Sequence, residues 1–368
     1  MLTTALYTSE DTAAISCCIC GSPTPEVAVM PPVLYPPGAA VMAPIAGHTD
    51  IPFRRMIRRF GCRHAFTEMI DAGSLVFQGE KTLRLAQRGS DAGFLGIQLV
   101  GSDLPTLKRA AELINDMDFD ALDFNLGCPA PKVARKCEGI RFALEDPDGA
   151  IRAFETLVSA SRLPVTAKTR IQDESDPAPT IAFCRRLRDA GAKSITIHGR
   201  LMRNFYSGPV FYEIISAVRE SLDIPVVANG GAMDGASFRT LLKKTGCSAG
   251  MVARGALGNP WIFREIADPS APPPDVAEFT ETIRVYMEDM LDCYGPEFAY
   301  VVARKSLLEF LRGRGYPGAL RASISYLDSA DALKKLLDAV AEGPTERYLE
   351  NLALHPESVE RKLVRSHS

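Results

Sequence analysis

The sequence lacks the features that would place the chain in a membrane or in the secretory pathway. None of its apolar runs approaches the ~20 residues that a membrane-spanning helix needs. The first lysine or arginine is Arg54, so the basic start of a secretory signal is missing. The nine cysteines are odd in number and scattered, which argues against a secreted disulfide scaffold. We therefore expect a cytoplasmic protein that binds no membrane.

The sequence also lacks a strong excess of charge of either sign. Its 42 basic and 45 acidic side chains leave a net charge of −3, which by itself does not indicate a nucleic-acid-binding protein. It does not exclude one either, because binding depends on where the charges lie. Apolar residues make up 46% and charged residues 24% of the 368 residues, which excludes disordered and fibrous classes.

The first 35 residues differ in composition from the rest of the chain. They hold four prolines, a Cys17-Cys18-Ile19-Cys20 cluster and no lysine or arginine. Cys17 and Cys20 have the spacing of half a zinc knuckle, but no second cysteine pair has that spacing. We expect a weakly structured extension over residues 1–35 and no metal site. The alternative is a metal or redox role for the cysteine cluster.

From residue 40 onward, eight short apolar runs alternate with longer amphipathic stretches. The runs are Val41–Ile45, Ala65–Met69, Gly96–Val100, Ala121–Asn125, Val165–Thr169, Ser194–His198, Pro225–Asn229 and Gly250–Ala253. Strands that alternate with helices indicate a parallel sheet, and eight such units indicate a closed (β/α)8 TIM barrel over residues 36–267. The rival is an open doubly wound sheet. That fold usually has a glycine-rich phosphate turn after its first strand, where this chain has Ala43–Gly47.

A second region follows the barrel. The segment Asp268–Asp275 carries four prolines and reads as a stiff linker. Beyond it, 3.6-residue periodicity predicts helices over Phe279–Tyr294, Ala299–Leu311 and Ala330–Ala341. We expect a small helical bundle domain over residues 268–342, followed by a weakly structured tail over residues 343–368.

Most of the predicted strands end in a polar residue or a glycine. These residues are Gly47, Glu68, Gln98, Asn125, Lys168, His198, Asn229 and Arg254, with Cys128, Arg170 and Arg200 close behind. The working face of a barrel enzyme lies at the C-terminal ends of its strands. Because a purely structural barrel does not need so many polar strand ends, their joint pattern indicates an active site.

Two of these strand ends have the character of a phosphate site. Asn229-Gly230-Gly231 ends the seventh run and Ala253-Arg254-Gly255 ends the eighth. Glycines let backbone amides approach an anion, and an arginine can bind phosphate in a bidentate manner. Barrel phosphate sites are frequently built from the loops after strands seven and eight. The alternative is that the glycines only form tight turns.

Lys168 and Cys128 indicate redox chemistry. A lysine at the mouth of the barrel is suited to stabilise the anionic form of a reduced flavin, although a structural salt bridge is the alternative. Cys128 lies in the segment Asn125-Leu126-Gly127-Cys128-Pro129, where its thiol should be accessible. The sequence has no clear Cys-His-Asn arrangement, so a proton-donating thiol is favoured over thiol-protease chemistry.

At this point the motifs resemble those of a known family, the tRNA-dihydrouridine synthases, most closely its bacterial B-type branch. The motifs are Ala43-Pro44-Ile45-Ala46-Gly47-His48-Thr49-Asp50, Thr67-Glu68-Met69, Ile97-Gln98-Leu99, Asn125 to Pro129, Val165 to Arg170, Ile197 to Arg200, Ala228 to Gly231 and Asn259 to Phe263. The match runs from about Val41 through Leu337 and includes Tyr294-Gly295-Pro296 and Ala303-Arg304-Lys305. Each motif alone is modest, but their order and spacing are strong evidence.

The resemblance implies an FMN-dependent oxidoreductase that reduces the C5–C6 double bond of uridine in tRNA, with NADPH reducing the flavin. It implies that Cys128 is the general acid and that Asn125 and Arg170 face the uracil, which must first leave the base stack. It implies FMN contacts from Pro44, Ile45, Ala46, Gln98, Lys168, His198, Asn229, Gly230, Gly231, Ala253 and Arg254. We expect tRNA as the partner and no obligate protein partner.

Basic residues give partial support for RNA binding. They are Lys132, Arg135 and Lys136 after the Cys128 motif, and Arg304, Lys305 and Arg312 in the helical region. A basic stripe of this kind could follow an RNA backbone, and solvated charged faces are the alternative.

The sequence also departs from the family. Gly139 is followed by the bulky Ile140, Arg141 and Phe142, and Ala253 replaces the usual glycine. Two alternative functions therefore stay open. One is an FMN-barrel oxidoreductase acting on a free pyrimidine-like molecule, and the other is an altered family member that only binds RNA.

Overall fold

The computed structural model describes residues 34–90 and 93–355. The predicted extension over residues 1–35, with Cys17, Cys18 and Cys20, therefore lies almost entirely outside the described residues. Its last residue, Tyr35, is described and is only 3% exposed. Tyr35 packs its ring edge-on against His64 and Phe94, so the prediction of weak structure is wrong at this position.

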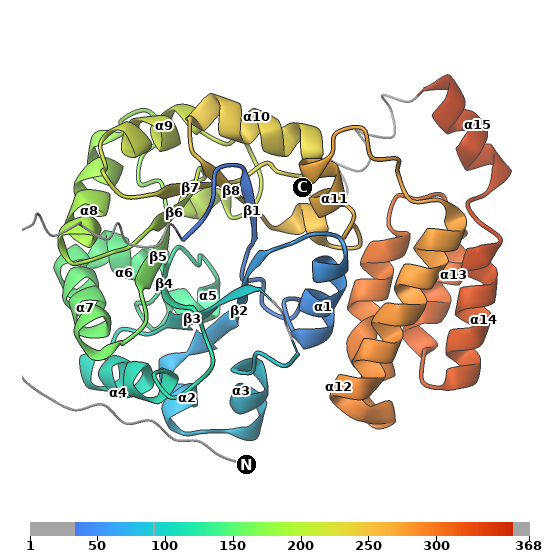
Figure 1. Ribbon diagram of the computed structural model, residues 1–368, viewed down its shortest axis with the longest axis horizontal. Coiled ribbons are helices and arrows are strands. Elements are labelled where there is room, and N and C mark those ends of the chain that lie inside the picture. Colours follow the sequence, from blue (N-terminus) through green and yellow to red (C-terminus); the bar gives the residue numbers. More distant parts are fainter. Residues whose placement is uncertain (1–33, 91–92, 356–368) are drawn as a thin grey trace, which may run out of the picture. The chain divides into compact units, whose positions relative to one another are not determined.

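Eight parallel strands close into a barrel in chain order, with β1 pairing with both β2 and β8 (Figure 1). The strands are β1 (Ala39–Met42), β2 (His64–Asp71), β3 (Phe94–Val100), β4 (Ala121–Leu126), β5 (Val165–Arg170), β6 (Ile195–His198), β7 (Val226–Asn229) and β8 (Ala249–Val252). Each strand overlaps one predicted apolar run. The predicted TIM barrel is confirmed, and the open doubly wound sheet is excluded.

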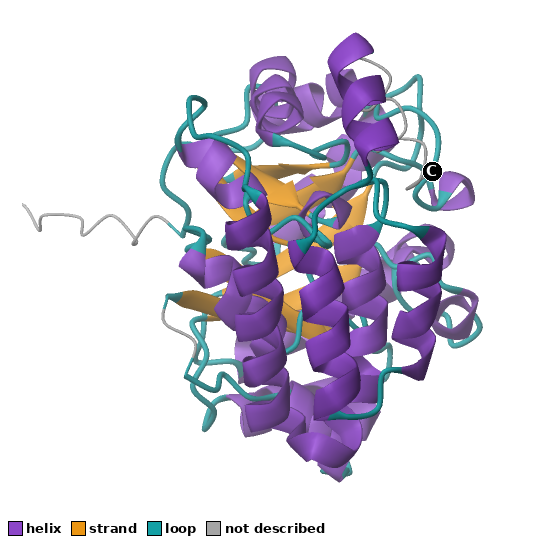
Figure 2. Ribbon diagram, turned by 90° about the vertical axis from the view of Figure 1, so that its right-hand side faces the viewer, coloured by secondary structure: helices purple, strands orange, loops and turns teal. Residues whose placement is uncertain are grey.

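Helices cover the outside of the strands, as both views show (Figures 1 and 2). Within the barrel region they are α1 (Ile51–Arg59), α2 (Ala72–Val76), α3 (Glu80–Leu85), α4 (Leu104–Ile114), α5 (Pro131–Ala134), α6 (Ile140–Glu145), α7 (Pro147–Ala160), α8 (Ala178–Asp189), α9 (Tyr212–Glu220), α10 (Gly235–Thr245) and α11 (Ile262–Ala267), with short 3-10 turns η1 (Met202–Asn204) and η2 (Arg254–Ala256). Local signals set these bounds. Helix α10, for example, begins at the Asp234–Ser237 capping box and ends at Gly246, whose φ of 65° is left-handed.

Apolar side chains fill the N-terminal end of the barrel interior. Tyr35, Val41, Phe66, Val227 and Ala249 belong to one buried cluster there. A closed floor of this kind leaves only the opposite end, where the strands terminate, for a ligand to enter. This is the end at which the sequence places its polar strand ends.

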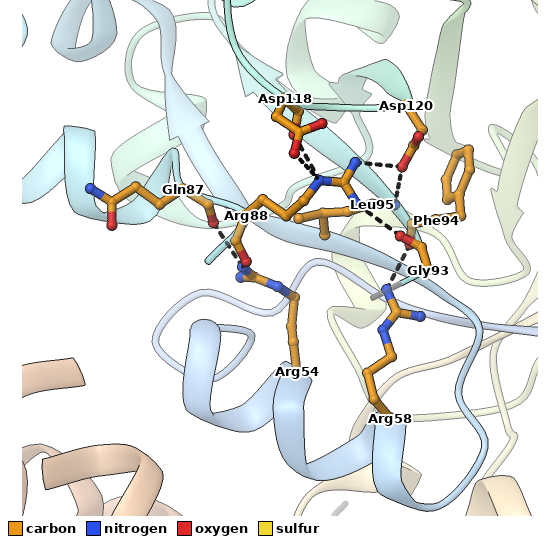
Figure 3. A network of polar contacts seen from close by, with 9 residues as sticks. All are labelled: Arg54, Arg58, Gln87, Arg88, Gly93, Phe94, Leu95, Asp118 and Asp120. Carbon is orange, nitrogen blue, oxygen red and sulfur yellow. Dashed lines mark hydrogen bonds and ion pairs between the residues drawn. The ribbon is translucent and has the colours of Figure 1, made fainter. Parts of the chain in front are cut away.

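Arginines fix the first helix against the segment that leads into β3 (Figure 3). Arg54 of α1 is buried and donates to the carbonyl oxygens of Gln87 and Arg88 at 2.8 and 3.1 Å. Arg58 donates to the Phe94 carbonyl at 2.7 Å, and Arg88 pairs with Asp120 at 2.7 Å. These contacts hold α1, and with it the loop between β1 and α1, in a fixed position at the rim of the barrel.

The C-terminal region is helical, as predicted. Its elements are α12 (Val276–Leu311), α13 (Gly318–Ser323), η3 (Ile324–Tyr326), α14 (Ala330–Ala341) and α15 (Glu346–Leu354). The two helices predicted over Phe279–Tyr294 and Ala299–Leu311 are the halves of α12, which bends at Gly295, with a φ of 69°, before Pro296. Proline lacks the N–H that a continuous helix would use there.

Helix α12 packs against α1 of the barrel. Asp289 of α12 accepts from Arg59 at 2.6 Å, and Asp292 accepts from Arg55 at 2.7 Å. At the other end of the contact, the ring of Trp261 stacks on Phe279, with 5.6 Å between the centroids. The guanidinium carbon of Arg314 lies over both rings, at 5.6 and 5.2 Å. Ion pairs and an aromatic stack therefore join the helical region to the barrel.

The prediction of a weakly structured tail from Gly343 onward is wrong for α15. The hydroxyl of Tyr348 donates to the Gly313 carbonyl at 3.0 Å, and the Thr345 N–H donates to the Gly315 carbonyl at 3.1 Å. Gly315 has a φ of 78°, and the ring of Tyr348 occupies the space that a Cβ would need there. One tyrosine packed on a glycine therefore anchors this helix, which buries no residue fully.

Candidate active site

A cavity of about 420 Å³ opens among the loops that follow the strands. This volume lies in the range of small-molecule and cofactor sites. Its wall combines apolar groups with cations, and among the described residues that line it there is no carboxylate. The residues are Ala43, Pro44, Ile45, Ala46, His48, Met69, Asn125, Gly127, Cys128, Pro129, Lys168, Arg170, His198, Arg200, Tyr206, Asn229, Gly230, Gly231, Ala232, Met233, Met251, Ala253, Arg254 and Leu257.

The structure brings nearly all of the predicted catalytic, substrate and cofactor residues to this one cavity. Those in its wall are Pro44, Ile45, Ala46, Asn125, Cys128, Lys168, Arg170, His198, Asn229, Gly230, Gly231, Ala253 and Arg254. Gln98 is the exception, because it lies beneath the wall and is fully buried. Its amide nitrogen donates to Asp123 at 2.7 Å and its oxygen accepts from Asn125 at 2.8 Å. Gln98 therefore positions a residue of the wall.

The loop that carries Cys128 is held from three sides. The amide oxygen of Asn125 accepts from the backbone N–H groups of Gly127 and Cys128, at 3.1 and 2.8 Å. Arg170 donates to the Gly127 carbonyl at 2.7 Å. Gly139, with a φ of 64°, packs so closely that a Cβ there would lie 2.6 Å from the Cys128 carbonyl oxygen. The thiol is therefore presented to the cavity from a fixed backbone.

The charges of Lys168, in the cavity wall, and of the buried Asp123 influence each other. Burial raises the pKa of Asp123 to about 6, although Thr166 donates to its carboxylate at 2.6 Å and Gln98 at 2.7 Å. Burial, and then the neighbouring Arg170, lower the pKa of Lys168 to about 8. An anion bound in the cavity would stabilise the protonated form of this lysine.

The far side of the cavity is also cationic. His198 lies 3.3 Å from a guanidinium nitrogen of Arg200, and burial with the charges of Arg170 and Lys168 holds the pKa of His198 well below its usual range. His198 is therefore neutral at pH 7. Beside it, Gly230 and Gly231 have φ values of 122° and 81°, which glycine adopts without strain. Together with Arg254, these residues make a wall that fits an anion such as a phosphate.

Sequence reasoning missed Tyr206. The guanidinium carbons of Arg170 and Arg254 lie 5.5 and 5.7 Å from the centroid of its ring, and Arg254 also donates to its carbonyl at 2.6 Å. Tyr206 follows Phe205, whose φ of 48° is rare for a residue with a side chain. The only sequence signal was an aromatic pair shortly after the strand-end group His198 to Arg200.

The bulky residues after Gly139 do not narrow the cavity. Ile140 and Phe142 are 0% and 4% exposed and belong to the main apolar core. Neither side chain is part of the cavity wall. These two side chains therefore contribute to the packing of the core and not to the wall of the cavity.

The basic residues predicted to bind RNA fall into two groups. Lys132, Arg135 and Lys305 are exposed. The other three are engaged within the protein, since Lys136 pairs with Asp71 at 2.6 Å, Arg312 pairs with Glu309 at 2.7 Å, and Arg304 donates twice to the Leu327 carbonyl, at 3.1 and 2.8 Å. The role of all six residues in RNA binding stays a prediction.

Comparison with known proteins decides the family. Residues 41–343 match the family model described as dihydrouridine synthase. The chain belongs to this family. It is 36% identical over 321 residues to a probable tRNA-dihydrouridine synthase of Rhodobacter capsulatus, with 85% of this chain and 95% of the relative covered. It is 30% identical to tRNA-dihydrouridine synthase B of Proteus vulgaris, with coverages of 82% and 95%. The resemblance inferred from the motifs is confirmed.

As a dihydrouridine synthase family member, the chain is an oxidoreductase. Among solved structures, 2-naphthoyl-CoA reductase has the same fold, with a TM-score of 0.51 at 7% identity, covering 63% of this chain and 50% of that chain. No helix in the described part of the chain is long and apolar enough to cross a membrane.

Proposed function

We propose that this chain reduces the C5–C6 double bond of uridine in tRNA to 5,6-dihydrouridine, with FMN as its cofactor and NADPH as the reductant of the flavin. The observation that carries the proposal is a cavity in which the Cys128 loop faces a cationic wall, and none of the described residues that line it is a carboxylate. The names of these relatives, tRNA-dihydrouridine synthases, support uridine in tRNA as the substrate.

The residues present fit a flavin mononucleotide. Arg254, with the backbone at Gly230 and Gly231, would hold the phosphate, because a guanidinium and glycine amides suit that group. Lys168 would face the part of the flavin that becomes anionic on reduction. The backbone and apolar side chains of Pro44–Ala46 would support the ring system. When bound and reduced, the flavin supplies the hydride that is added to C6 of the uracil.

Side chains of the protein would orient the uracil and donate a proton to it. Asn125 and Arg170 flank Cys128 in the cavity wall and would orient the uracil, so that C5 lies near Sγ of Cys128. Addition of a hydride at C6 leaves negative charge on C5 and on the conjugated O4. The thiol of Cys128 gives its proton to C5, and the resulting thiolate regains a proton from solvent. Both C–H bonds of the product are then accounted for.

The test is nucleoside mass spectrometry of tRNA from cells with and without the gene. We expect dihydrouridine to disappear from at least one tRNA position when the gene is deleted and to return when it is restored. Unchanged dihydrouridine in every tRNA, with reduction of a free pyrimidine by the purified protein, would show instead an FMN-barrel enzyme that acts on a small molecule.

A further inference from the structure

The loop between β1 and α1 forms one continuous part of the cavity wall. Ala43, Pro44, Ile45, Ala46 and His48 all line the cavity. The loop contains no strand or helix of its own, so its shape depends on contacts with other elements. Because this loop would support the ring system of the flavin, the contacts that hold it also influence how well FMN fits.

Two carboxylates hold this loop. Glu68 of β2 accepts a hydrogen bond from the Gly47 N–H. Asp50 ends the loop and caps α1, because its Oδ1 accepts from the Phe53 N–H at 3.1 Å. Asp50 is only 9% exposed, and burial raises its pKa. The ionised form of this buried carboxylate therefore depends on the hydrogen bonds that it accepts.

One of these hydrogen bonds comes from the helical region. The hydroxyl of Tyr294 donates to Oδ2 of Asp50 at 2.8 Å, and this contact lowers the pKa of the carboxyl group. Tyr294 is the last residue of α12 before the bend at Gly295. The guanidinium carbon of Arg84, from α3, lies 5.8 Å from the centroid of its ring. A second contact with the barrel region therefore holds the ring while its hydroxyl reaches Asp50.

We propose that Tyr294 is a positioning residue for the cofactor, whose hydroxyl acts through Asp50 to fix the loop on which the flavin ring system rests. This inference rests on the proposed function, since it takes FMN as the ligand. Neither Tyr294 nor Asp50 is among the described residues that line the cavity, so an effect on FMN has to pass through the loop. Loss of the hydroxyl removes a charge-assisted hydrogen bond from a buried carboxylate, and we expect the loop to shift as a result.

The test compares Tyr294→Phe with the wild-type protein in its affinity for FMN. The full chain is stripped of FMN and titrated with it, and fluorescence quenching gives the dissociation constant. We expect Tyr294→Phe to raise this constant roughly tenfold. The visible circular dichroism of the bound flavin should also change, because the loop would lie against the ring system. A mere loss of stability would not alter this spectrum.

Tyr316→Phe is the matched control. The hydroxyl of Tyr316 donates to the Val340 carbonyl at 3.3 Å within the helical region, and the residue is buried. This variant loses a tyrosine hydrogen bond that does not involve the loop. It should therefore bind FMN as the wild type does, with an unchanged spectrum. Equal losses of FMN affinity in Tyr294→Phe and Tyr316→Phe would overturn the inference.

A double-mutant cycle with Asp50→Ala tests whether Tyr294 acts through Asp50. Asp50→Ala should weaken FMN binding at least as much as Tyr294→Phe does. The double variant should lose no more than Asp50→Ala alone, because both changes break the same contact. Additive losses, or normal FMN affinity in Tyr294→Phe, would overturn this inference and leave the proposed function standing. Wild-type protein that binds no FMN would contradict the proposed function and this inference with it.

Discussion

The amide oxygen of Asn125 accepts a hydrogen bond from the backbone N–H of Cys128 at 2.8 Å. The amide nitrogen of Asn125 is in turn oriented by Gln98, to which it donates at 2.8 Å. The side chain of Asn125, near the end of β4, therefore fixes the backbone of the Cys128 loop. Gln98 of β3 in turn fixes that side chain.

Replacement of Gln98 tests whether this residue acts by holding Asn125, and with it the Cys128 loop, in position. Gln98→Leu removes the acceptor of the Asn125 amide nitrogen and one of the two side-chain donors to the buried Asp123 carboxylate. We expect the free energy of unfolding to fall by about 2–4 kcal/mol in urea titrations. Dihydrouridine formation should slow while FMN affinity changes little, because Gln98 does not touch the cavity. Gln87→Ala is the control, since only its backbone carbonyl is used. Normal stability of Gln98→Leu would contradict this account.

Cys128→Ala should fold, bind FMN and accept electrons from NADPH, but form dihydrouridine ~10²–10⁴-fold more slowly. Reduction of the flavin does not need the thiol, whereas protonation of C5 does. Flavin absorbance reports the first step, and nucleoside mass spectrometry reports the second. Cys137→Ala is a matched control, because Cys137 lies in a separate hollow beside Ser102 and Arg152. Wild-type product formation in Cys128→Ala would show that this thiol is not the acid.

FMN affinity should depend on pH through Lys168. An anionic ligand binds the protonated amine more tightly than the neutral one. With a pKa of about 8 in the free protein, Lys168 loses its proton as the pH rises through that value, so FMN affinity should fall between pH 7 and pH 9.5. Fluorescence quenching of FMN measures this. Lys168→Met should bind weakly at every pH and lose the dependence, whereas the exposed Lys193→Met should behave as wild type. If FMN affinity still depended on pH in Lys168→Met, the dependence would belong to another titratable group.

Tyr206 should contribute to FMN affinity through its ring. Its face lies close to Arg170 and Arg254, and a cation–π contact is worth about 0.5–2 kcal/mol. Tyr206→Ala should therefore weaken FMN binding by roughly twofold to thirtyfold, and Tyr206→Phe should bind as wild type. Equal losses in the two variants would show that the hydroxyl matters and the ring does not.

The strands and most of the site could be predicted because buried parallel strands leave strong apolar runs with polar ends. Lys168 and Asn229 were found in this way. Tyr206 and His48 were not, since they lie in irregular loops where no period marks which side chain faces the cavity. The sequence interpretation of Gln98 as a strand end is wrong, because Gln98 lies inside β3, and only the structure shows that Asn125 and Asp123 engage its amide.

Contacts made by single residues were also invisible in the sequence. Helix α15 depends on Tyr348 packing against Gly315, a contact that no local sequence pattern reveals. Arg304 read as a surface cation, yet its guanidinium donates twice to the Leu327 carbonyl. Reversal of its charge would disturb the helical region itself, so Lys132, Arg135 and Lys305 are better probes of RNA binding.

The central claim is that this cavity reduces uridine in tRNA, and one single-turnover experiment tests it directly. Enzyme loaded with FMN is reduced by NADPH without oxygen and mixed with a tRNA transcript that carries no modifications. The account predicts that the flavin absorbance returns at a rate that rises with tRNA concentration, and that one dihydrouridine forms per flavin reoxidised. Reoxidation no faster with tRNA than without it, and no dihydrouridine in the recovered RNA, would contradict the claim.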